Sequence, residues 1–148
     1  EFVARRAIVM VANIPKIGGH MSGSAIDISV FRRADGEEVS RGGPYLTVNE
    51  TTPMRSPFIS AEHLQNRLEI TALMESHGFM HFPYEFWHFS KGDVADRIMN
   101  RDARPARFGA VNWDAEANAL AAVEAPKTPL NPLPQIEKEI EAALRRSK

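Results

Sequence analysis

The sequence contains no cysteine and no long apolar run, and its charge is nearly balanced. Without cysteine the chain can form neither a disulfide nor a thiolate metal site, so any metal site must use histidine and carboxylate ligands. No apolar run approaches the length of a membrane span. With 18 basic and 19 acidic residues, the chain gives no reason to expect nucleic acid or an anionic membrane as a partner. Its 148 residues are enough for one domain with a real core.

The first informative stretch is residues 19–30, which hold a histidine and a carboxylate in the pattern His20-x-x-Gly23-x-Ala25-x-Asp27. From Ala25 to residue 30 the residues alternate, which predicts a strand with its isoleucine and valine side chains in the core and Asp27 on a small, polar side. A carboxylate in such a place needs a cation, a hydrogen-bond donor or a metal. Gly23 permits a turn with positive φ that could bring His20 back towards Asp27. A turn histidine beside a salt-bridged aspartate explains these residues equally well.

The second stretch is Glu85-Phe86-Trp87-His88. Glu85 and His88 are three residues apart, so in a regular strand they would face opposite ways. Both can serve one site only if the strand ends or bulges there, and Pro83 just upstream favours such an irregular position. By periodicity alone, an aromatic-rich core strand with two polar residues at its end is the better interpretation.

Together the two patterns resemble the D-alanyl-D-alanine dipeptidases, from about Gly18 to Phe89. These belong to a wider zinc group that includes D-Ala-D-Ala carboxypeptidases and L-Ala-D-Glu-type endopeptidases. The resemblance implies that His20, Asp27 and His88 are zinc ligands and that Glu85 is the catalytic base. It further implies zinc-dependent hydrolysis of D-Ala-D-Ala-type dipeptides in bacterial cell-wall metabolism.

The sequence departs from this family at three places. Gly19 and Phe86 stand where the family usually has serine and tryptophan, and neither change affects a ligand or the base. The family also carries an arginine well upstream of the first motif, thought to stabilise the transition state. Arg5 and Arg6 lie upstream here, but nothing around them matches that arginine's motif, so neither is assigned. We expect a separate N-terminal polypeptide segment to complete the domain and supply the arginine.

The pattern of elements predicts an α+β fold in which a small antiparallel sheet, flanked by helices, carries the zinc site. The clearest helix is predicted from Ser60 as N-cap to Gly78 as its stop, with an apolar stripe. That stripe comprises Ala61, Leu64, Leu68 and Ala72, widened by Ile70, Leu73 and Met74. A hairpin is predicted at Asp35-Gly36, a long loop near the site over residues 45–57, and a strand, kink and strand over residues 79–89.

The C-terminal part is predicted to be a separate unit. Residues 1–125 would form the catalytic core, and residues 126–148 a proline-rich linker and an amphipathic helix over residues 133–146 that packs on the core. His63 and His77, on and at the end of the 60–78 helix, are predicted to be solvated. His81 is the rival to His88 as a ligand, and the resemblance favours His88.

Several functions remain open from the sequence. Within the same zinc group, a D,D-carboxypeptidase or a peptidoglycan endopeptidase would carry the same residues. Outside it, the chain could be a zinc-binding interaction domain without turnover or a structural domain without metal. The partner is expected to be a dipeptide or cell-wall peptide, and the compartment, cytoplasm or periplasm, is left open.

Overall fold

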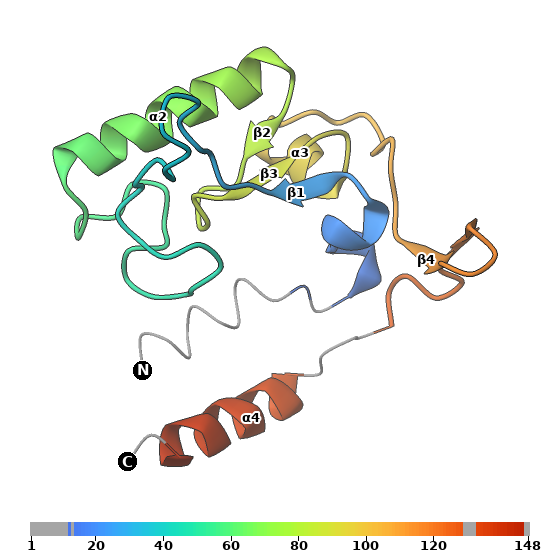
Figure 1. The fold of residues 1–148 in the computed structure, drawn as a ribbon. Helices are drawn as coiled ribbons and strands as arrows, with labels where there is room; N and C mark the ends of the chain where they lie inside the picture. The colour runs from blue at the N-terminus through green and yellow to red at the C-terminus, as the bar shows by residue number, and fades with distance from the viewer. Residues whose placement is uncertain (1–11, 13, 129–132, 147–148) are drawn as a thin grey trace.

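The fold is a small antiparallel sheet with a long helix against it and a separate hairpin, as Figure 1 shows. The computed structural model describes residue 12, residues 14–128 and residues 133–146. Within these residues the sheet and the helices confirm the predicted α+β class. No helix among them is long and apolar enough to cross a bilayer.

The main sheet has three short antiparallel strands in the order β1-β3-β2. Strand β1 spans Ala25–Asp27, β2 spans Met80–His81 and β3 spans His88–Ser90. Two 3-10 turns, η1 (Pro15–Ile17) and η2 (His20–Ser22), lead into β1. The register places Asp27 opposite His88, so the two sequence motifs meet across neighbouring strands.

Strand β1 is shorter than the alternation predicts, and its isoleucine does not lie in the core. Ile26 is 40% exposed although it pairs with Phe89, which is fully buried. The reason is its place in the sheet: β1 is an edge strand, and α2 packs against β2 at the opposite edge. The prediction that Ile26 faces the core is therefore wrong.

Helix α2 spans Ala61–Ser76 and confirms the predicted caps. The Ser60 hydroxyl accepts a hydrogen bond from the His63 amide, which satisfies one of the free N–H groups of the first turn. Gly78 has φ +78°, a left-handed conformation that glycine adopts at no steric cost, and the chain turns there towards β2.

The buried face of α2 differs from the predicted stripe. Its buried residues are Arg67, Ile70 and Thr71, whereas Leu73 is exposed. The apolar pattern missed this face because a buried arginine sits at its centre. The long loop that precedes the helix supplies backbone carbonyls as acceptors for that arginine.

The segment between β1 and α2 contains no regular strand in the described residues. The predicted hairpin at Asp35-Gly36 is present as a single antiparallel bridge between Phe31 and Glu38. The predicted long loop over residues 45–57 is present and consists of turns and bends.

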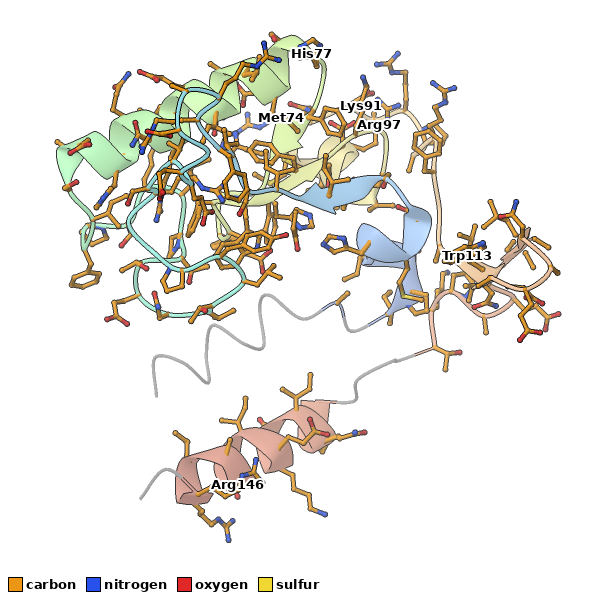
Figure 2. The ribbon with its side chains drawn as sticks, viewed as in Figure 1. Met74, His77, Lys91, Arg97, Trp113 and Arg146 are labelled. Atoms are coloured by element: carbon orange, nitrogen blue, oxygen red, sulfur yellow. The ribbon has the colours of Figure 1, made fainter. Side chains whose placement is uncertain are left out.

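After β3 the chain forms α3 (Val94–Met99), capped by Asp93, and then a hairpin of β4 (Val111–Asp114) and β5 (Ala119–Ala122). Trp113 on β4 is 66% exposed, and Figure 2 shows it on this hairpin, away from α2 and the main sheet. Helix α4 spans Leu133–Arg146, as predicted. The division into a core over residues 1–125 and a C-terminal unit packed on it stays a prediction.

Candidate metal site

His20 is presented by η2, a single tight turn that sits between two glycines. Gly23 ends the turn with φ +65°, so the predicted left-handed turn is present and returns the chain to β1. Gly19, at its start, packs so closely that an added Cβ would lie 2.8 Å from Oδ2 of the buried Asp93. The turn is held further by the Ser22 hydroxyl, which donates to the Gly19 carbonyl.

Glu85 and His88 reach one site because β3 begins only at His88. The residues before it form a tight turn in which the His88 amide donates to the Glu85 carbonyl at 3.3 Å. The sequence predicted such an irregular position, because Glu85 and His88 are three residues apart and would face opposite ways in a regular strand. Phe86 and Trp87 between them are buried and anchor the turn in the core.

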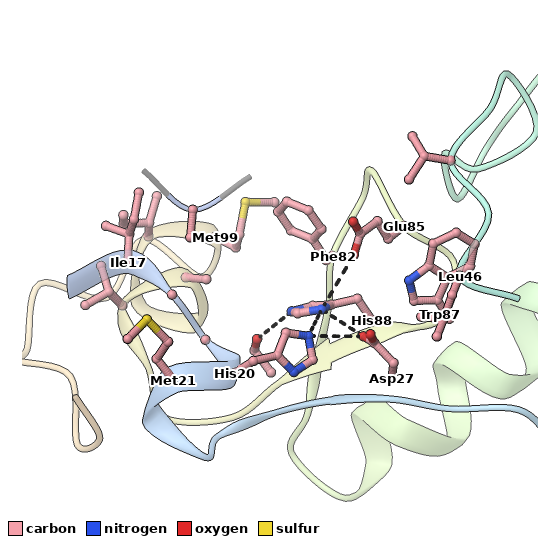
Figure 3. A pocket seen from close by; sticks show the side chains of 18 residues that line it. Ile17, His20, Met21, Asp27, Leu46, Phe82, Glu85, Trp87, His88 and Met99 are labelled. Carbon is pink, nitrogen blue, oxygen red and sulfur yellow. Dashed lines mark hydrogen bonds and ion pairs between the residues drawn. The ribbon is translucent and has the colours of Figure 1, made fainter. Parts of the chain in front are cut away.

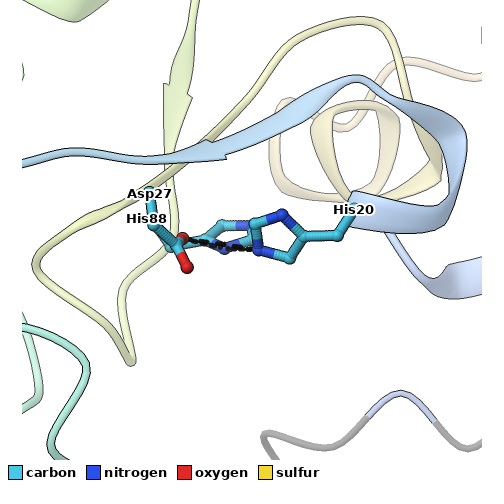
Figure 4. Close-up of side chains that lie close together, drawn as sticks. All are labelled: His20, Asp27 and His88. Carbon is cyan, nitrogen blue, oxygen red and sulfur yellow. Dashed lines mark hydrogen bonds and ion pairs between the residues drawn. The ribbon is translucent and has the colours of Figure 1, made fainter.

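Three side-chain atoms from these elements face one another, as Figure 4 shows. Nδ1 of His88 lies 3.0 Å from Oδ1 of Asp27 and 3.1 Å from Nε2 of His20. Nε2 of His20 is 3.4 Å from the same Asp27 oxygen. The three residues that the sequence singled out as ligands thus converge on one point.

This arrangement fits a small cation better than it fits hydrogen bonds alone. A neutral histidine carries one N–H, and the Nδ1 of His88 cannot donate to both of its neighbours at once. A tetrahedral zinc ion with bonds of about 2.0–2.1 Å holds its ligand atoms about 3.3 Å apart. The observed separations of 3.0, 3.1 and 3.4 Å are close to that value. Two imidazoles and a carboxylate also form a donor set that suits zinc.

The Ser90 side chain orients the His88 ring from behind. The Ser90 hydroxyl lies 3.3 Å from Nε2 of His88, and Ser90 is fully buried. With an ion bound, the Ser90 hydroxyl can accept the ring proton of His88 on Nε2, which leaves the lone pair of Nδ1 for the ion. Sequence reasoning missed Ser90, although it lies two residues beyond His88 in β3 and so on the same face of the strand.

The electrostatics of the two carboxylates differ. Burial by itself would raise the pKa of Asp27, but the hydrogen bond from His88 and the charges of both histidines outweigh it, so the pKa lies below its ordinary value. Burial raises the pKa of Glu85, the His88 charge opposes this, and the Asp27 charge adds to it. Asp27 therefore stays ionised beside the histidines, whereas Glu85 binds a proton more readily than an exposed glutamate.

The remaining histidines of the described chain lie outside this group. Nε2 of His63 bonds the Ser40 hydroxyl, and His77 forms the C-terminal cap of α2. Nδ1 of His81, the rival ligand, instead lies 2.8 Å from a carboxylate oxygen of Glu75. The structure thus brings His88 rather than His81 to His20 and Asp27.

A cavity of about 570 Å³ opens in front of the three facing atoms, and Glu85 lines it (Figure 3). His20 stands on the open side with 55% of its side chain exposed, against 13% for His88. The wall of the cavity is mainly apolar; its labelled members include Ile17, Met21, Leu46, Phe82, Trp87 and Met99. No sequence signal marks most of these residues, because they come from separate loops and from α3.

The chain matches a known family over most of its length. The model of the D-Ala-D-Ala dipeptidase family of peptidases matches residues 5–105, which include all four residues of the candidate site.

Individual relatives carry the same name. The D-alanyl-D-alanine dipeptidase of Enterococcus faecium is 29% identical over 87 residues, which cover 59% of this chain and 43% of that protein. The D-alanyl-D-alanine dipeptidase of Enterococcus faecalis is 28% identical over 87 residues, which again cover 59% of this chain and 43% of that protein. The one of Synechocystis is 35% identical over 88 residues, covering 50% of this chain and 34% of the relative.

The chain thus spans less than half the length of the curated relatives that it matches. These relatives come from bacteria, in line with the expected bacterial origin. The comparisons give no support for the expected separate N-terminal polypeptide, and Arg5 and Arg6 lie outside the described residues.

Proposed function

Because this chain belongs to the D-Ala-D-Ala dipeptidase family of metallopeptidases, we propose that it carries the metal site and the catalytic base of a zinc-dependent hydrolase that acts on D-Ala-D-Ala-type dipeptides. One observation carries this proposal: His20, Asp27 and His88 face one another at 3.0–3.4 Å, with the Glu85 carboxylate beside them. The substrate class comes from the relatives' names. The residue roles come from the resemblance of the two motifs to the family, and the geometry supports them.

The three facing side chains would hold the ion. Their donor set leaves a tetrahedral ion with room for a further ligand on the open, His20 side of the cavity, as in catalytic rather than structural sites. Zinc held there would supply a Lewis acid that polarises a substrate carbonyl and makes water more acidic.

Glu85 would act as the general base. Its Oε2 lies 3.6 Å from Nδ1 of His88, close to the three facing atoms without being one of them. It lines the same cavity, so a substrate and a water molecule can reach it. Burial raises its pKa towards the working pH, which suits a group that takes a proton from attacking water and passes it to the leaving amine.

The test compares zinc content and hydrolysis in the wild-type chain and in Glu85→Gln. The variant keeps the shape of the side chain but cannot accept the proton. We expect it to retain about one zinc per chain, and to lose turnover of D-Ala-D-Ala by about 10²–10⁴-fold. Zinc is measured by plasma mass spectrometry and turnover by release of free D-alanine.

Glu75→Gln is the matched control. It makes the same chemical change outside the site, because Glu75 pairs with His81 on the surface. Full turnover in Glu85→Gln would remove Glu85 from the role of base. If the wild-type chain binds no zinc, the proposed metal site is wrong, and the alternative of a structural domain without metal is favoured. Zinc without turnover would favour an interaction domain. Cleavage of longer cell-wall peptides in preference to the dipeptide would favour the carboxypeptidase or endopeptidase alternative.

A further inference from the structure

Arg67 is a buried cation that bonds backbone carbonyls instead of a carboxylate. It is 1% exposed, and no ion pair to an acidic side chain is found for it among the described residues. Its Nε donates to the Arg41 carbonyl at 2.6 Å and its Nη2 to the Thr51 carbonyl at 2.9 Å. Its Nη1 donates to the carbonyls of Pro53 and Met54 at 2.7 and 3.4 Å. The planar fork of a guanidinium reaches these acceptors from three separate nitrogen atoms, whereas an ammonium group has a single nitrogen.

These acceptors lie at the two ends of one loop. Arg41 precedes residues 42–50, and Thr51 to Met54 follow them, so one side chain ties the two ends of the loop together. The loop carries Leu46 and Val48 into the wall of the cavity beside the candidate site. It has no regular secondary structure to hold its shape, so its anchoring depends on contacts of this kind.

The same guanidinium touches the segment that carries the proposed base. Its carbon lies 4.0 Å from the centre of the Phe86 ring, a cation–π distance, and Phe86 is the neighbour of Glu85. Two backbone bonds continue the link, since the Phe86 amide donates to the Thr52 carbonyl and the Met54 amide to the Pro83 carbonyl. Loop, ring and turn are thus joined around Arg67.

We propose that Arg67 is a positioning residue, which holds the 42–50 wall of the cavity and the Glu85–Trp87 turn in register with each other. This inference rests on the proposed function for its meaning in catalysis. Arg67 lies on α2, outside the two motifs. Its effect is on the cavity wall and on the base, and not on the three facing side chains.

The buried charge itself supports a specific role. Burial first, and then the charge of Arg41, lower the pKa of Arg67 to about 10, so the group remains charged at neutral pH in an environment that disfavours charge. An apolar residue at this position of α2 would pack without that cost but would leave the loop carbonyls without donors.

The test is Arg67→Lys in the zinc-loaded full chain, with Ile70→Val as the matched control. Lysine keeps the charge and loses the fork and the flat contact with Phe86. Ile70 is buried on the same face of α2, and its substitution removes one methylene and no hydrogen-bond donor. Zinc content, amide hydrogen exchange, and kcat and KM for D-Ala-D-Ala are measured on both variants.

We expect Arg67→Lys to keep its zinc, because none of the three facing side chains bonds Arg67. Exchange at the Thr52, Met54 and Phe86 amides should become at least tenfold faster, and kcat/KM should fall about 10–100-fold with a rise in KM. Ile70→Val should alter neither the exchange at these amides nor kcat/KM. Unchanged exchange at these amides in Arg67→Lys, or an equal change in Ile70→Val, would overturn the proposal.

A second variant covers the case in which Arg67→Lys does not fold. Phe86→Leu removes the ring that lies on the guanidinium and leaves all the carbonyl acceptors in place. We expect zinc to be retained and kcat to fall at least fivefold; an unchanged kcat would count against the positioning role. If the wild-type chain binds zinc but cleaves no dipeptide, the proposed function fails, while the exchange measurement still decides whether Arg67 holds the loop.

Discussion

Replacing Ser90 with alanine would show how far the site depends on support from behind the His88 ring. The Ser90 hydroxyl is the partner of Nε2 at 3.3 Å, and because Ser90 is fully buried, water cannot easily take its place. Without it the ring proton can move to Nδ1, where Oδ1 of Asp27 accepts it at 3.0 Å and the lone pair is lost for metal binding. Loss of such a supporting partner weakens metal binding about 10–100-fold. Since 3.3 Å is long for a hydrogen bond, we expect the lower end, about tenfold or ~1.4 kcal/mol.

The assay is competition for zinc between the purified protein and a chromophoric chelator of known affinity. Ser24→Ala is the control, because Ser24 is also buried, but its hydroxyl donates to Asp93 at 3.0 Å and is not the partner of His88. An unchanged zinc Kd in Ser90→Ala would refute the reasoning. So would an equal loss in Ser24→Ala, because the effect would then be one of general packing in this part of the fold.

Two further predictions concern stability. Gly19→Ser introduces the residue that is usual in the family. It should lower the free energy of unfolding, measured in urea, by about 1–3 kcal/mol, because the new Cβ would lie 2.8 Å from Oδ2 of Asp93. An unchanged urea midpoint would contradict this close packing. Glu85→Gln should stabilise the metal-free protein at pH 7 but not below about pH 4. Burial raises the folded-state pKa of Glu85, so stability is full below the unfolded pKa and is lost as pH rises through the folded pKa. Urea midpoints of both proteins at pH 4 and pH 7 check the sign, and a less stable variant at pH 7 would contradict it.

The candidate site could be located from the sequence because its side chains come from two short, local patterns that together resemble those of a known family. Glu85 and His88 had to lie at the end of a strand for both to face one site, and β3 does begin at His88. The turn at Gly23 was likewise required to bring His20 back, and its φ is +65°. Local spacing alone does not show which strands pair in the sheet. Asp27 and His88 are 61 residues apart in the sequence, and the pairing of β1 with β3 brings them together.

The β4–β5 hairpin shows a local signal that was not recognised. Its alanines favour helix by propensity, so residues 112–125 had no clear prediction. The turn chemistry is nevertheless present: Oδ1 of Asp114 accepts from the amides of Glu116 and Ala117, and Asn118 adopts a left-handed φ of +47°. Asp and Asn in these roles favour a turn over a continuing helix.

Residue types and short-range spacing were sufficient for the ends of α2 and for the break that the Glu85–His88 pattern needs before β3, because caps, turns and spacing act over a few bonds of backbone. The identity of the facing residues needed, in addition, the resemblance of the two patterns to a known family. Packing decided the rest. Ile26 is exposed because β1 is an edge strand, and Arg67 is buried because a distant loop supplies its acceptors. Burial depends on which segments meet across the fold, and the same apolar or charged residue can be core or surface until that arrangement exists.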